Sequence, residues 1–134
     1  MSVLIDGTLR GTAVTLVHGP SGAVVETRPP VDNGGDGSRF SPTDLCAASL
    51  GACAATIVGL YAQRTGIPLD GVTFSVEKEM TPPPRRIGRL TLRFQLRTSC
   101  SDRELDRLVA AARTCPVRLS LGDGVEVVES YERA

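Results

Sequence analysis

The chain has 134 residues, of which 41% are hydrophobic and 4% are aromatic, and it contains no tryptophan. Its 15 Lys and Arg residues equal its 15 Asp and Glu residues in number, so its formal net charge at pH 7 is zero. This length suits a single domain spanning residues 1–134. The lack of a basic excess and of aromatic stacking surfaces argues against a nucleic-acid partner.

The N-terminal part of the chain consists of short runs of β-forming residues. Strands are expected at residues 3–6, 13–18 and 23–27. The turn sequence GPSG at residues 19–22 should join the last two strands as an antiparallel hairpin. Proline, glycine and aspartate then dominate residues 29–39, which predicts a mobile loop.

A long central helix is predicted from the start signal SPTD at residues 41–44. Ser41 suits the N-cap, the proline suits the first helical position, and Asp44 suits the third position of a capping box. The helix should run to about Arg64, with Gly66 as its stop. Because the segment is apolar on nearly all sides and rich in small residues, we expect it to be buried, in part by a partner subunit.

Two amphipathic strands follow, around residues 72–76 and 90–96. Their alternating apolar and polar side chains predict an antiparallel sheet with one face in water. A second helix is expected to begin at Ser101 and to break at Cys115, before a short helical turn and a last strand at residues 125–129. The predicted fold class is therefore α+β.

The expected location is the cytoplasm, because the chain opens without a signal peptide pattern and no apolar run reaches the roughly 18 to 20 residues that span a bilayer. Thiols are kept reduced there, so redox, metal or packing roles are expected for the four cysteines rather than structural disulfides. No cofactor and no membrane partner are predicted.

Cys53 and Cys115 are the candidate functional thiols. Cys53 lies among Ala and Gly residues that leave room for a substrate, and Cys115 lies at a helix break, where unsatisfied N–H groups favour an anion. Two such thiols suit a cycle in which one forms a sulfenic acid and the other a disulfide. Core packing is the alternative for both, and it is preferred for Cys46 and Cys100. With His18 as the only histidine and no local ligand pairs, no metal site is predicted.

Two motifs resemble the OsmC/Ohr family of osmotically inducible and organic hydroperoxide resistance proteins, in its general OsmC-like group. The sequence SPTDL, which leads into ASLGAC at residues 48–53, is similar to the family's cysteine helix, and RTCPV at residues 113–117 is similar to its Cys-Pro motif. The order of elements agrees over nearly the whole chain. The resemblance implies an OsmC-like fold of N-terminal antiparallel strands, a buried central Cys helix, further strands and a second helix, assembled as an intertwined homodimer.

The same resemblance implies a thiol-dependent peroxidase that reduces organic hydroperoxides and, as a further substrate, hydrogen peroxide. Cys53 would be the peroxidatic thiol and Cys115 the resolving thiol. A dithiol such as a lipoylated protein would reduce the resulting disulfide. In the family an N-terminal arginine activates the peroxidatic thiolate, and the candidates in this sequence are Arg10, Arg28 and Arg39.

Further site residues are also expected, in addition to the two thiols and the arginine. Asp44 is the candidate carboxylate for that arginine, although helical spacing places it about 180° around the helix and about 13 Å along it from the peroxidatic thiol, which favours a capping role. Thr43 stands where the organic-hydroperoxide subgroup has Glu. Phe40, Leu50 and Ile57 are expected to line an apolar substrate pocket. The competing hypothesis is a non-catalytic binding protein of this fold with buried thiols.

Overall fold

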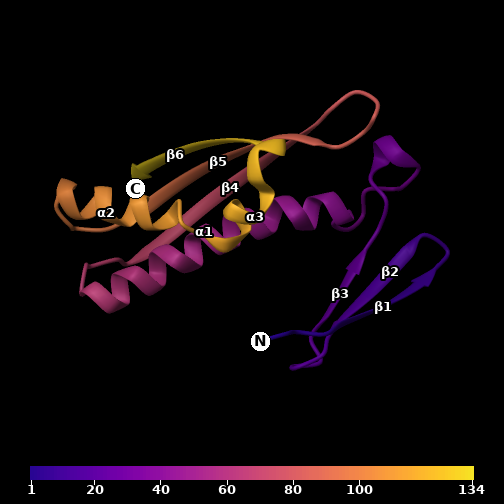
Figure 1. The fold of residues 1–134 in the computed structure, drawn as a ribbon, viewed down its shortest axis with the longest axis horizontal. Helices are drawn as coiled ribbons and strands as arrows, with labels where there is room; N and C mark the ends of the chain where they lie inside the picture. Colours follow the sequence, from indigo (N-terminus) through magenta and orange to yellow (C-terminus); the bar gives the residue numbers. More distant parts are fainter. The chain divides into compact units, whose positions relative to one another are not determined.

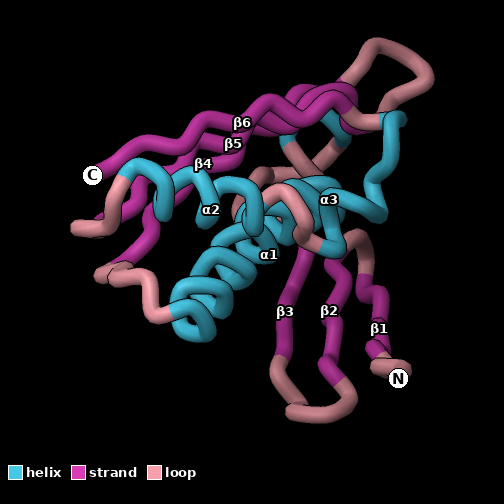
Figure 2. The backbone as a smooth tube through the Cα atoms, turned by 60° about the vertical axis from the view of Figure 1, so that its left-hand side comes forward, coloured by secondary structure: helices cyan, strands magenta, loops and turns pink.

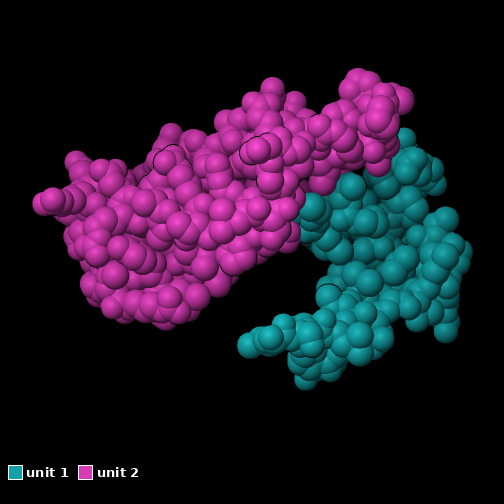
Figure 3. Space-filling model, in the orientation of Figure 1, with its two compact units in different colours: residues 1–46 teal, residues 47–134 magenta.

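The computed structural model describes residues 1–134 and shows three α-helices and six strands (Figure 1). In chain order the elements are β1 (Ile5–Arg10), β2 (Ala13–His18), β3 (Val24–Thr27), α1 (Pro42–Thr65), β4 (Gly71–Met80), β5 (Ile87–Arg97), α2 (Asp102–Ala112), α3 (Pro116–Leu121) and β6 (Glu126–Arg133). They form two compact units, residues 1–46 and residues 47–134 (Figure 3). The helices and two separate sheets confirm the predicted α+β class.

The first unit contains an antiparallel sheet in the order β1-β2-β3. The β2–β3 hairpin is confirmed, whereas β1 starts later and runs further than the predicted strand at residues 3–6. Opposed residues share a face of the sheet, so the register of the three strands gathers most of their large apolar side chains on one side. That apolar face consists of Ile5, Leu9, Val14, Leu16 and Val25.

The segment predicted as a mobile loop contains a short 3₁₀ turn at Val31–Asn33. The two ends of the loop are joined, because the Arg28 N–H donates to the Phe40 carbonyl at 3.1 Å. The loop therefore closes on itself within the first unit.

α1 begins and ends where the sequence predicted. The Ser41 N–H donates to Asp44 Oδ2 at 2.9 Å and the Asp44 N–H donates to Ser41 Oγ at 3.1 Å, which forms the expected capping box. At the other end Gly66 adopts a left-handed φ of 75° and donates its N–H to the Ala62 carbonyl. This conformation suits glycine and stops the helix.

One expectation about α1 needs correction, namely that no apolar run matches the dimensions of a bilayer. α1 has 24 residues and a mean hydropathy of 1.8 in its most apolar window, so by length and composition alone it is long and apolar enough to cross a membrane. Core helices pass the same test, and Leu50 and Val58 of α1 are each only 1% exposed in the hydrophobic core. Within the chain 33% of that window is fully buried, most of the other α1 residues are partly buried, and Leu60 is 39% exposed.

The second unit contains a sheet in the order β4-β5-β6. β5 pairs antiparallel with β4, as predicted, and parallel with β6, which the sequence pattern did not indicate. The parallel pairing arises because the chain leaves the end of β5, passes through α2 and α3, and returns to place Glu126 beside Arg89. β6 is also longer than the predicted strand at residues 125–129. The helices lie on one side of this sheet (Figure 2).

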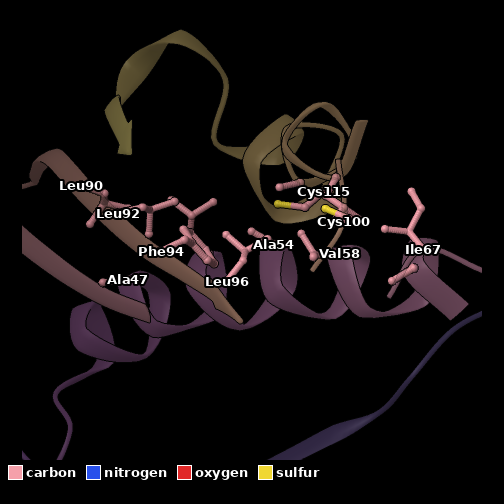
Figure 4. Close-up of a cluster of buried hydrophobic side chains, with 14 residues drawn as sticks. Ala47, Ala54, Val58, Ile67, Leu90, Leu92, Phe94, Leu96, Cys100 and Cys115 are labelled. Atoms are coloured by element: carbon pink, nitrogen blue, oxygen red, sulfur yellow. The ribbon is translucent and has the colours of Figure 1, made fainter. Parts of the chain in front are cut away.

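The hydrophobic core of the second unit lies between β5 and α1 (Figure 4). Four alternating β5 side chains are at most 1% exposed, namely Leu90, Leu92, Phe94 and Leu96. Close packing also involves Gly51 of α1, where an added Cβ would lie 2.4 Å from the Phe74 ring of β4. The small residues of α1 thus let a strand approach the helix closely.

Candidate functional site

Cys53 lies near the middle of α1, at the border between core and surface. Its side chain is half-buried and packs against the core, and its neighbours are the exposed Ala52 and the buried Ala54. Both sequence neighbours of Cys53 are alanines, whose side chains are small. Cys53 is therefore a free thiol with partial access from outside the second unit.

Cys115 caps the first turn of α3, as the sequence indicated. Its Sγ accepts a hydrogen bond from the Arg118 N–H at 3.3 Å, and Pro116 follows at the first helical position. The residue is completely buried and lies over the middle of α1 (Figure 4). The Cys-Pro break in the chain thus fixes this thiol in the core.

The structure brings Cys53 and Cys115 together. The Cys53 side chain lies close enough to Cys115 to affect the ionisation of its thiol, and neither cysteine is in a disulfide. Burial raises the pKa of Cys115 above its ordinary value, and Cys53 raises it further, whereas the N–H groups of Arg118 and Val117 act in the opposite direction. At neutral pH Cys115 is therefore a thiol rather than a thiolate.

The two thiols differ in how exposed they are to molecules outside the protein. Cys53 reaches the surface while Cys115 does not, so an external electrophile would meet Cys53 first. Neighbouring thiols of this kind can form a disulfide after one of them is oxidised. No group of three or more His, Cys, Asp or Glu side chains is arranged to hold a metal ion.

The candidate arginines belong to the first unit. Arg10 and Arg28 line one cavity of about 530 Å³ on the polar side of the N-terminal sheet. Arg28 also forms a 2.7 Å ion pair with Glu26 in the same cavity, whereas the exposed Arg39 makes no side-chain ion pair. Which of the three arginines serves Cys53 stays a prediction.

The remaining predicted residues fall in different environments. Asp44 caps α1 through its hydrogen bonds with Ser41. Phe40 is 55% exposed in the first unit, and Leu50 is enclosed in the core. Ile57 lines a groove between α1 and α2. The role of these side chains in a substrate pocket stays a prediction.

The sequence profile of OsmC-like proteins matches residues 35–130, which is well over half of the chain. The chain belongs to the OsmC-like protein family. A solved structure with 31% sequence identity agrees, namely that of an osmotic stress-induced and detoxification response protein of Psychrobacter arcticus. The match covers 100% of this chain and 96% of that chain, with a TM-score of 0.87.

Two more distant structures share the OsmC-like fold. An organic hydroperoxide resistance protein OsmC of Legionella pneumophila is 21% identical, with 98% of this chain and 97% of that chain covered and a TM-score of 0.80. OhrB of Bacillus subtilis, an organic hydroperoxide resistance protein, is 17% identical, with 98% of each chain covered and a TM-score of 0.70. These two likenesses concern the fold alone. No curated protein matches the chain.

The OsmC-like core also holds an ionic cluster that the sequence interpretation missed. Glu129 of β6 has a side chain only 7% exposed, and it faces Arg118 at 2.5 Å and Arg113 at 3.5 Å. The contact with Arg118 Nη1 is an ion pair without the alignment of a hydrogen bond. The Tyr131 hydroxyl donates to Glu129 Oε1 at 3.1 Å. Burial, then the Glu129 charge, raises the pKa of Tyr131 above its usual range.

A signal for this cluster was present in the sequence. Val127, Glu129 and Tyr131 alternate along β6, so a carboxylate stands on the apolar face of a strand. Buried charges are normally paired, which calls for arginine partners from another element. Arg118 lies three residues after Cys115, so the cluster adjoins the helical turn that holds the buried thiol.

Proposed function

We propose that the chain is a thiol-dependent peroxidase that reduces organic hydroperoxides, and hydrogen peroxide as a further substrate, through Cys53 and Cys115. The observation that carries the proposal is the proximity of these two free thiols in the second unit. Membership of the OsmC-like family and the likeness to organic hydroperoxide resistance proteins support it.

The proposed cycle has three steps. The Cys53 thiolate attacks the outer oxygen of the hydroperoxide, the O–O bond breaks, and the alkoxide takes a proton and leaves as an alcohol. The Cys115 sulfur then attacks the Cys53 sulfenic acid, which forms a disulfide and releases water. A dithiol, such as that of a lipoylated protein, reduces the disulfide by two thiol exchanges and becomes a cyclic disulfide itself.

The different access of the two thiols sets their proposed roles. Cys53 is half-buried and can meet a substrate, whereas Cys115 is enclosed and stays protonated at neutral pH. We assign the activation of Cys53 to one of Arg10, Arg28 and Arg39, because guanidinium stays charged and binds an anion with two donors. Asp44 is the proposed carboxylate partner of that arginine.

A homodimer is part of the proposal, with residues 1–134 acting as one OsmC-like domain of each subunit in the cytoplasm. The apolar face of the N-terminal sheet supports it, since Ile5 is 61% exposed and Leu9 65% exposed. Leu60 of α1 adds to this surface, since it is 39% exposed within the chain. Exposed apolar surface of this extent favours association with a second copy. Phe40, Leu50 and Ile57 are the proposed substrate-binding residues.

The test is steady-state peroxidase turnover of the full chain with cumene hydroperoxide and a lipoyl reducing system coupled to NADH. Cys53→Ser is expected to abolish turnover. Cys115→Ser is expected to leave one burst of substrate reduction and no sustained cycle. Cys46→Ser is the matched control and is expected to retain turnover. Full turnover by Cys53→Ser would rule out the proposed cycle.

A second candidate function is a non-catalytic binding protein of the OsmC-like fold. The complete burial of Cys115 favours it, because an enclosed thiol is also what plain core packing produces. Peroxide treatment of the native protein followed by peptide mass spectrometry separates the two functions. A Cys53–Cys115 cross-link supports the peroxidase, and two unmodified thiols support the binding protein.

A further inference from the structure

A groove between α1 and α2 is separate from the thiol pair but begins beside it. The groove has a volume of about 440 Å³. Its lining residues are Ile57, Leu60, Tyr61 and Arg64 of α1 and Arg107, Ala110, Ala111 and Thr114 from α2 and the turn after it. All of them belong to the second unit, so the groove is complete within residues 47–134.

The two helices run antiparallel along this groove, which gives it two different ends. Cys115 meets Cys53 at one end, and Arg107 Nε donates to the Tyr61 hydroxyl at 3.1 Å toward the other. Ile57 lies one turn beyond Cys53, and Thr114 directly precedes Cys115. The groove therefore has a thiol end and an arginine end.

The arginine end carries two guanidinium groups without a carboxylate partner. Arg107 lies over the Tyr61 ring at 5.7 Å, and its hydrogen bond goes to the neutral Tyr61 hydroxyl. Arg64 and Arg107 form no ion pair with an acid of the chain. Two such cations above an apolar floor attract an anionic head group, because arginine matches a carboxylate with two parallel donors.

The distance between the two ends sets the length of a suitable ligand. Ile57 and Arg64 are seven residues apart on α1, or about 10 Å along the helix. An extended alkyl chain can lie over Leu60, Ala110 and Ala111 between them. Such a chain would place its anionic end at the arginines and its other end toward the thiols.

We propose that this groove is a binding site for alkyl carboxylates, with Arg64 and Arg107 holding the carboxylate. Its role in catalysis rests on the proposed function: the site makes the enzyme select hydroperoxides that carry a carboxylate over their neutral esters. Arg64 and Arg107 are specificity residues, because they bind the end of the substrate remote from the reacting oxygen atoms.

The first test measures binding alone, by calorimetric titration of the reduced full chain with decanoate, decanol and decyl phosphate. Decanoate is expected to bind roughly tenfold or more tightly than decanol, with an affinity that falls as salt is added. Arg64→Gln combined with Arg107→Gln should remove this preference. The matched control, Arg97→Gln on the exposed side of β5, should keep it.

A second variant separates the groove from the charge. Ala110 is exposed, so Ala110→Phe should fold normally while filling the groove, which unchanged circular dichroism and Tm would verify. This variant is expected to lose binding of both decanoate and decanol. Equal affinity of the wild type for decanoate and decanol overturns the carboxylate site. Binding of decyl phosphate without decanoate overturns it as well.

A kinetic arm distinguishes failure of this site from failure of the peroxidase. The double arginine variant should raise KM for a hydroperoxide with a carboxylate at least fivefold and leave KM for its methyl ester and both kcat values unchanged. Decanoate binding without any turnover would end the peroxidase proposal and keep the site. Normal turnover with equal KM for acid and ester would end the site and keep the peroxidase.

Discussion

The two sheets of this chain share a strand number and an amphipathic pattern but differ in what covers them. Each has three strands and one apolar face. In the second unit the apolar face of β5 packs on the core, where Phe94 is 1% exposed. In the N-terminal sheet Leu9 of the apolar face is 65% exposed. The same sequence pattern therefore gives a self-sufficient layer in one unit and a surface that lacks a cover in the other.

The largest expected effect comes from the covered sheet. Phe94 stacks with Phe74 at 5.5 Å and with Tyr131 at 5.0 Å, so Phe94→Ala empties the middle of an aromatic row. We expect a loss of about 3–5 kcal/mol in the free energy of unfolding, measured by urea denaturation. The matched control is Phe40→Ala, because Phe40 is 55% exposed in the first unit, and it should cost about 0.5 kcal/mol or less. Equal costs for the two variants would contradict the comparison.

The ionic cluster at Glu129 gives the next largest effect. Glu129→Gln removes the charge opposite Arg118 and Arg113 and leaves the buried Nη1 of Arg118 without its ion-pair partner. The expected cost is about 2–3 kcal/mol in the free energy of unfolding, also from urea denaturation. On the solvent side of the same sheet, Glu77→Gln breaks the Arg93 ion pair, both of whose side chains are 56% exposed, and little change is expected. If Glu77→Gln lowered the free energy of unfolding as much as Glu129→Gln does, the buried cluster would contribute no more to stability than an exposed ion pair.

How far the sequence predicted the structure depends on whether a feature is local. The capping box of Ser41 and Asp44 and the stop at Gly66 were predictable, because each depends on residues within one turn of the helix. The parallel pairing of β6 was not, because it depends on the path of α2 and α3 over the sheet. The meeting of Cys53 and Cys115 likewise joins residues far apart in sequence, and the resemblance to a family suggested it where spacing did not.

A substitution on the exposed apolar face of the N-terminal sheet should weaken the association of two chains rather than the folding of one. Leu9→Ser removes an apolar side chain from the exposed face, and on the order of 1.5 kcal/mol per buried leucine is expected to be lost from the proposed homodimer. Sedimentation at several concentrations should show a weaker dimer. Asp6→Ser, on the opposite face of β1, is the control and should leave the dimer unchanged. A dimer that is indifferent to Leu9→Ser would place the contact surface elsewhere.

The smallest expected effect is a pH dependence of stability from the enclosed thiol. Burial raises the pKa of Cys115 in the folded chain above its ordinary value of 9.0, whereas the unfolded chain keeps the ordinary value. As pH rises past 9.0 the unfolded state loses this proton first, so the free energy of unfolding falls, and below that pH the contribution is fully present. Urea denaturation of the reduced protein should show this fall before Tyr131, with an ordinary pKa of 10.0, adds its own. Cys115→Ser keeps an acceptor at the cap of α3 but cannot ionise in this range, so its slope should be shallower. Cys46→Ser should keep the wild-type slope, and an unchanged slope in Cys115→Ser would mean that the thiol ionises as readily in the fold as outside it.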